Sequence, residues 1–279
     1  MWAGNWVMGR AMRDEFGPVA LNFWRWLIAA LVLAPFALPR LAGKGALLRR
    51  HAGILLLLSL IGVALFQSLV YLGLRTTTAV NAVLLNSSGP MFILLCAWAI
   101  DRQRATWRQV GGILVSLAGI LVILSRGEPS RLLELEFHLG DAWILLAILL
   151  WGVYSVMLKR RPAELSGEEL LFVMSLAGVA LLVPAFVVEA QFLPPRVPGA
   201  AAAAGALYIG LFASAGAFIC WNRGVAIVGP NAAGFTLHLL PAFGTILALL
   251  FLGESFQAFH AAGIATILVG VIVATREKG

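Results

Sequence analysis

Apolar runs of about twenty residues follow one another along almost the whole chain. They cover residues 19–38, 53–73, 77–99, 107–124, 142–158, 169–188, 200–221, 231–252 and 259–275. A helix needs about 20 apolar residues to cross roughly 30 Å of hydrocarbon, so each run is a candidate transmembrane helix. Trp2 to Gly9 is apolar but too short, and we interpret it as the end of a tenth span. The strands of a membrane barrel are shorter and alternate in polarity, so we predict an all-α integral membrane fold.

The amino-acid composition excludes most other classes of protein. The chain is 61% apolar and only 12% charged, whereas soluble domains carry about 25% charged residues. We therefore expect no domain outside the membrane. The net charge of +7 comes from short basic clusters between the apolar runs, so we expect the lipid bilayer as a partner and no nucleic acid. Cys96 and Cys220 lie inside apolar runs, and we predict neither a disulfide, nor a metal, nor any cofactor.

The basic residues predict the orientation, because cytoplasmic loops hold the excess of Lys and Arg. Connections on one side, together with the C-terminal tail, hold 13 of them and those on the other side hold 6. We therefore predict a multi-pass cell membrane protein with both termini in the cytoplasm. The oligomeric state is not specified, and a monomer is compatible with the sequence.

The two halves of the chain resemble each other. A shift of 151 residues aligns Gly73 with Gly224, Pro90 with Pro241, Gly112 with Gly263 and Gly119 with Gly270. Nearer the N-terminus a shift of 149 residues aligns Trp2 with Trp151, Met8 with Met157, Arg10 with Lys159 and Pro35 with Pro184. We interpret this as an internal duplication.

The duplication predicts the domain organisation. A first five-helix repeat covers residues 1–125, a connecting loop covers 126–140, and a second five-helix repeat covers 141–279. Because five is odd, the second repeat enters the membrane inverted relative to the first. Inverted repeats can exchange conformations and so support alternating access.

Interrupted spans at matching places are the best sequence pointer to a transport site. Pro90 and Pro241 each remove a helix hydrogen bond and leave carbonyls free near mid-membrane. A simple packing kink is the alternative. Polar and aromatic side chains in other spans should face a cavity, since facing lipid is costly. The candidate substrate-binding residues are Gln67, Tyr71, Asn86, Ser87, Ser88, Pro90, Trp151, Tyr154, Trp221, Asn222, His238 and Pro241, with Asn5 and Trp6 as further wall residues.

Arg25 lies seven residues inside the run 19–38. A charge there costs about 2.5–3.5 kcal/mol on insertion scales. We expect its side chain to reach the outer headgroups, with contact to a substrate carboxylate as the alternative. His238 is the histidine deepest in a span, and no Asp or Glu occupies a span centre. Proton coupling would therefore involve His238, or transport is uncoupled.

Several motifs resemble the ten-span EamA group of the drug/metabolite transporter superfamily. They are Trp2 to Arg10, Trp151 to Lys159, Asn22 to Trp26, the prolines at 90 and 241, and Leu252-Gly253-Glu254. The resemblance implies a basket-like bundle around a central cavity, placed in a bacterial inner membrane, and export of amino acids, drugs or metabolites. The chain is similar in particular to bacterial aromatic amino acid exporters. Just before Pro90, where an aromatic amino acid exporter would have bulky residues, this chain has Ser87, Ser88 and Gly89. This difference suggests a roomier pocket.

The expected function is a secondary transporter of a small solute, and not an enzyme. Two alternatives stay open. A passive pore would conduct without saturation. An intramembrane serine hydrolase would use Ser88 and His238 as a dyad, although nothing in the sequence specifies an oxyanion site.

Overall fold

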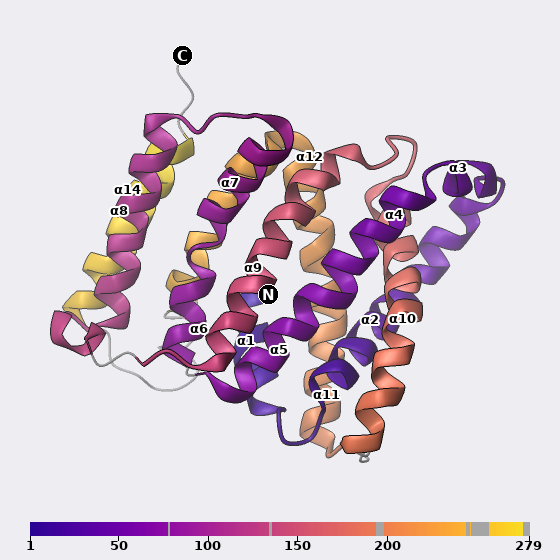
Figure 1. Ribbon diagram of the computed structural model, residues 1–279, viewed down its shortest axis with the longest axis horizontal. Helices are drawn as coiled ribbons and strands as arrows, with labels where there is room; N and C mark the ends of the chain where they lie inside the picture. The colour runs from indigo at the N-terminus through magenta and orange to yellow at the C-terminus, as the bar shows by residue number, and fades with distance from the viewer. Residues whose placement is uncertain (78, 134–135, 194–197, 244–245, 247–256, 276–279) are drawn as a thin grey trace.

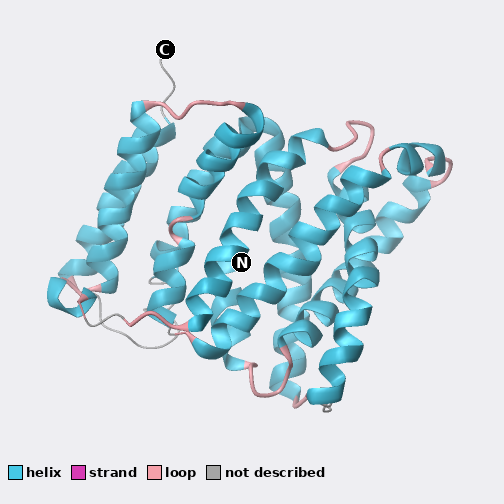
Figure 2. Ribbon diagram, in the orientation of Figure 1, coloured by secondary structure: helices cyan, strands magenta, loops and turns pink. Residues whose placement is uncertain are grey.

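The computed structural model describes residues 1–77, 79–133, 136–193, 198–243, 246 and 257–275. Within these ranges the chain consists of helices and their connections, without a strand (Figure 2). The all-α prediction is confirmed for the described part. The α-helices are α1 (Trp2–Ala11), α2 (Pro18–Leu41), α3 (Gly45–Arg50), α4 (Ala52–Leu58), α5 (Phe66–Thr76), α6 (Ala79–Asn86), α7 (Gly89–Asp101), α8 (Trp107–Leu124), α9 (Leu139–Met157), α10 (Gly167–Phe192), α11 (Ala200–Tyr208), α12 (Ala217–Phe235) and α14 (Ala258–Thr275). Shorter elements are η1 (Ser59–Leu65), η2 (Pro129–Leu132), η3 (Leu158–Arg160), η4 (Ile209–Gly216) and η5 (Thr236–His238).

Eight helical stretches of the described chain are long and apolar enough to cross a membrane. One of them, Ala200–Phe243, has 44 residues, or about 66 Å at 1.5 Å per residue. That is roughly twice the hydrocarbon thickness. Gly229 divides it, because its φ of 79° and ψ of 164° are not helical and Pro230 follows directly. The stretch therefore combines the predicted run 200–221 with the beginning of 231–252, the remainder of which lies largely outside the described residues.

The helices break where the prolines predict. Helix α6 ends at Asn86, and α7 begins at Gly89 with Pro90 in its first turn. Before Pro241 the chain forms one turn of 3₁₀ helix, η5. In addition, η1 and η4 are π-helical, and the 151-residue shift aligns these two segments. Such segments are rare and occur often at functional sites.

Helices α8 and α14 lie side by side at one end of the bundle (Figure 1). A Cβ added to Gly112 or Gly119 would meet the carbonyl oxygen of Gly270 or Gly263, respectively. The numbers rise along one helix and fall along the other, so the pair is antiparallel. Ser116 donates a 3.3 Å hydrogen bond to the Ile267 carbonyl between these contacts. Glycines allow this close backbone approach.

Helices α2 and α10 lie side by side toward the other end of the bundle (Figure 1). The Glu189 carboxylate accepts hydrogen bonds from the backbone N–H groups of Val19 and Ala20, at 2.9 and 2.7 Å, and so caps the start of α2. After the other end of α2, Lys44 Nζ lies 2.7 Å from Glu169 Oε1. The two helices are therefore joined near both ends.

Polar contacts differ between the two ends of the helices. At the end that holds α3, Asp101 pairs with Lys159 at 2.7 Å and with Arg160 at 3.3 Å, beside the Lys44–Glu169 pair. At the opposite end, Asp141 accepts hydrogen bonds from the side chains of Thr77 and Asn81. A cavity of about 590 Å³ also opens at that end, between the α1–α2 connection, α5, α10 and α11.

Candidate functional site

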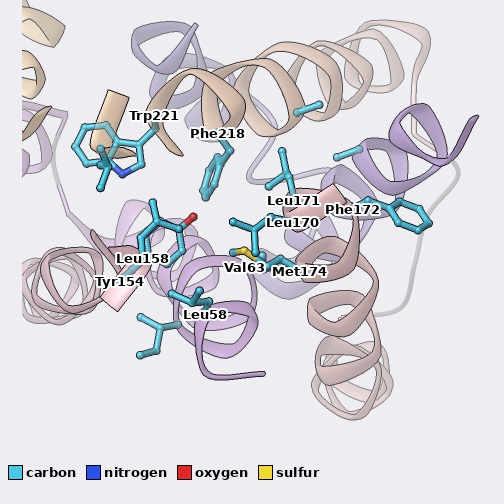
Figure 3. Packing of buried hydrophobic residues seen from close by; sticks show 14 of the residues in the cluster. Leu58, Val63, Tyr154, Leu158, Leu170, Leu171, Phe172, Met174, Phe218 and Trp221 are labelled. Atoms are coloured by element: carbon cyan, nitrogen blue, oxygen red, sulfur yellow. The ribbon is translucent and has the colours of Figure 1, made fainter. Parts of the chain in front are cut away.

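An aromatic cluster lies where α1, α5, α9 and α12 meet. Trp151 is at its centre, with ring centroids 5.3 Å from Trp2, 4.7 Å from Phe66 and 5.1 Å from Trp221. Phe218 joins it from α12, 5.5 Å from Trp151. Figure 3 shows Tyr154, Phe218 and Trp221 among the other buried apolar side chains. The predicted residues Trp151, Tyr154 and Trp221 are thus brought together as one wall.

A small cavity of about 30 Å³ adjoins this cluster. Its lining consists of Trp2, Asn5, Phe66, Gln67, Asn86, Gly89, Ile148, Trp151, Leu237 and Leu240. Of the predicted residues, Asn5, Gln67, Asn86 and Trp151 line it. A cavity holds one water molecule for roughly every 10–15 Å³ of such volume, so this one has room for about two. An organic solute could enter only if the surrounding helices moved apart.

Two tyrosine–asparagine hydrogen bonds flank the cavity. Tyr71 of α5 donates to Asn5 Oδ1 of α1 at 2.9 Å. Tyr154 of α9 donates to Asn222 Oδ1 of α12 at 2.8 Å. All four side chains are buried. The predicted residues Tyr71, Tyr154 and Asn222 are therefore fixed in orientation by these pairs.

Arg25 is buried within the protein, with 1% of its surface exposed. Its Nε donates to Ser214 at 2.7 Å, its Nη1 to Tyr71 at 3.0 Å and to Asn5 at 3.3 Å, and its Nη2 to the Ala213 carbonyl at 3.2 Å. The prediction that Arg25 reaches the headgroups is wrong, because neutral groups inside the bundle accept the hydrogen bonds of its guanidinium instead. No Asp or Glu pairs with it among the described residues.

Several buried donors around the cavity have no hydrogen-bond partner. They are Gln67 Nε2, Trp151 Nε1, Trp221 Nε1 and Asn222 Nδ2. Buried polar groups are nearly always paired in native structures. A concentration of unpaired donors in one place therefore indicates a site for a water or a ligand that offers acceptors.

The residues around the two interruptions are engaged in helix contacts. His238 Nε2 lies 2.8 Å from the Ser87 carbonyl oxygen, a contact between positions that the 151-residue shift aligns. Ser87 and Ser88 donate their hydroxyls to the carbonyls of Val83 and Leu85. The structure therefore forms no Ser88–His238 hydrogen bond of the kind a hydrolase dyad needs. Pro90 and Pro241 are buried outside the cavity lining.

Sequence reasoning missed part of the lining. Trp2 could have been found, because the 149-residue shift aligns it with Trp151. The apolar residues Phe66, Ile148, Leu237 and Leu240 carry no signal that separates them from lipid-facing residues. The side chain of Trp6 lies outside the described residues. In the described ranges no cluster of three His, Cys, Asp or Glu side chains is placed to hold a metal ion.

Comparisons with known proteins cover almost the whole chain. The model of the EamA-like transporter family matches residues 1–125 and 138–276. An uncharacterized transporter of Archaeoglobus fulgidus is 27% identical over 100% of this chain and 94% of its own length. A probable terminal-alkyne amino-acid exporter of Streptantibioticus cattleyicolor is 29% identical over 99% and 90%. An S-adenosylmethionine/S-adenosylhomocysteine transporter of Chlamydia muridarum is 26% identical over 92% and 82%. One solved crystal structure superposes with a TM-score of 0.78 at 21% identity and covers 98% of this chain and 92% of its own.

Proposed function

The chain belongs to the EamA-like transporter family, and from this premise we propose that it is a secondary transporter of small organic solutes, namely amino acids or related metabolites. The transport path runs through the cavity beside Trp151. Relatives named as an amino-acid exporter and as an S-adenosylmethionine transporter support this substrate range. In this proposal the direction is export across the cell membrane.

The observation that carries the proposal is the gathering of unpaired donors and aromatic rings at one buried place. Gln67 and Trp151 line the cavity with a free N–H each. Rings from α1, α5, α9 and α12 surround them. Ligand sites combine an apolar wall with a few polar groups that fix orientation. Amino acids with apolar side chains suit such a site.

Alternating access follows if the halves are inverted five-helix repeats, with ten crossings in total. Three features support this arrangement: the antiparallel glycine contacts of α8 with α14, the matched π-helical segments η1 and η4, and the two Tyr–Asn pairs. In the opposite state the end that holds the Asp101 and Glu169 ion pairs would open, and the end near Asp141 would close. We further propose that the ion-paired end is cytoplasmic, together with both termini.

Counterflow in proteoliposomes tests this function. Vesicles preloaded with one amino acid would be offered labelled amino acids, S-adenosylmethionine or cationic drugs, with and without a pH gradient. A carrier predicts saturable uptake that the internal solute accelerates. Trp151→Ala should reduce it strongly, whereas Trp107→Ala, at a side chain 91% exposed, should not. Linear flux without acceleration would instead indicate a passive pore.

A further inference from the structure

Arg25 places an uncompensated positive charge inside the bundle. Its hydrogen-bond acceptors, from Ser214, Tyr71, Asn5 and Ala213, are all neutral. No carboxylate pairs with it in the described part of the chain. Buried charges in proteins are usually paired, since removing them from water is costly. A bound anion would supply the counter-charge that the protein itself does not.

Asn5 connects this charge to the cavity. Its Oδ1 accepts from both Arg25 and Tyr71, while the residue itself lines the cavity next to Gln67. The Arg25–Asn5 contact of 3.3 Å is the longest of the guanidinium's hydrogen bonds. N–H···O bonds are most often about 2.9–3.0 Å. This contact is therefore the one that a ligand oxygen can most easily replace.

The unpaired hydrogen-bond donors near Arg25 also favour an anionic ligand. Gln67 Nε2 and Trp151 Nε1 can only donate, and neither has a partner. An ionised carboxylate only accepts, at two oxygens, and so matches two donors and a cation. A protonated amine that has no carboxylate beside it would leave both donors unpaired and would be repelled by Arg25.

The second half of the chain lacks an equivalent charge. The 149-residue shift aligns Arg25 with Met174, which is fully buried in the apolar cluster with Phe218 and Tyr154 (Figure 3). At this aligned position, the buried positive charge therefore belongs to the first half alone. An amphipathic solute would have one favoured orientation.

We propose that Asn5, Gln67 and Trp151, with Arg25 behind them, form a carboxylate subsite, and that the rings of Trp2 and Phe66, which line the same cavity, receive the apolar part of the same solute. This rests on the proposed function and narrows it. Substrates are then amphipathic carboxylates, including apolar amino acids, and amphipathic cations without a carboxylate are excluded. Arg25 and Tyr71 act as positioning residues.

Direct binding tests the subsite separately from transport. Tryptophan fluorescence of the purified full chain would be titrated with L-leucine, L-leucinamide and isoamylamine, which differ at the carboxylate. Leucine is expected to bind at least tenfold more tightly than the other two. Gln67 Nε2 lies near the Tyr71 hydroxyl but forms no well-aligned hydrogen bond with it. Gln67→Met should therefore preserve the fold and lower leucine affinity about tenfold, with little change for leucinamide. Gln191→Met, at an exposed position, is the matched control.

Arg25→Gln and Arg25→Lys complete the test. Arg25→Gln should abolish the preference for leucine over leucinamide, and Arg25→Lys should retain part of it. If Arg25→Gln fails to fold, Gln67→Met still decides. Equal affinity of all three compounds, or an unchanged preference in Gln67→Met, would overturn the subsite even if counterflow is saturable. Selective carboxylate binding without saturable counterflow would instead contradict the proposed function alone.

Discussion

Tyr154 and Asn222 form a buried hydrogen bond of 2.8 Å between α9 and α12. The two alignment shifts match Tyr154 with Asn5 and Asn222 with Tyr71, and that second pair is also bonded, at 2.9 Å. The residue types are exchanged between the halves, but the contact is kept. Each half thus joins two of its own helices beside the cavity with the same chemistry.

Tyr154→Phe should destabilise the protein. It leaves the buried Asn222 Oδ1 without a donor, which costs about 1–3 kcal/mol. We expect a lower melting temperature in detergent and slower solute counterflow in vesicles. Tyr208→Phe is the control, because the Tyr208 hydroxyl makes only a 3.3 Å bond near the surface. Equal melting temperatures of the two variants would contradict a structural role for the Tyr154–Asn222 pair.

Gly73 and Gly224 provide a matched pair of helix glycines. A Cβ at Gly73 would lie 2.6 Å from Ile144 Cγ1 and 2.7 Å from the Gly140 carbonyl oxygen, whereas Gly224 has nothing within 4 Å. Gly73→Ala should therefore cost about 1–3 kcal/mol by overpacking. Gly224→Ala should be neutral or stabilise by about 0.5–1 kcal/mol, since Ala favours helices. Thermal unfolding of both variants checks this, and a greater loss in Gly224→Ala would refute the packing.

Asp101 joins the two halves at the end that holds α3, through Lys159 and Arg160. Partly exposed ion pairs contribute about 0.2–1 kcal/mol each. Because Asp101→Asn removes both pairs, it should raise the population of molecules that are open at this end by about two- to thirtyfold. The readout is thiol labelling of Leu240→Cys, which lines the cavity, in protein with Cys96 and Cys220 replaced.

Asp14→Asn is the control for this experiment. Asp14 pairs with Arg13 at 3.7 Å, is largely exposed and borders the larger cavity at the opposite end. It should leave labelling through the α3 end unchanged. Identical labelling rates in Asp101→Asn and Asp14→Asn would show that the Asp101 pairs do not hold that end closed.

The sequence predicted the helices well because about twenty consecutive apolar residues have few alternatives to a spanning helix. It also pointed to Gln67 and Tyr71, since polar groups in spans seldom face lipid. Arg75, about two turns further along the same helix, is exposed and borders the larger cavity. The destination of Arg25 could not be predicted. It depends on a carbonyl at Ala213 and a hydroxyl at Ser214, about 190 residues away, which only tertiary packing brings near.

Cysteine mapping of the connections tests the inverted arrangement most directly. Arg50→Cys, before the run 53–73, and Arg161→Cys, before 169–188, would be placed singly in cysteine-free protein, with Ser130→Cys for the opposite side. Labelling of intact cells with an impermeant thiol reagent should modify Ser130→Cys, while Arg50→Cys and Arg161→Cys react only after the cells are opened. If Arg50→Cys and Arg161→Cys react from opposite sides, the halves are not inverted repeats and the proposed exchange between them is contradicted.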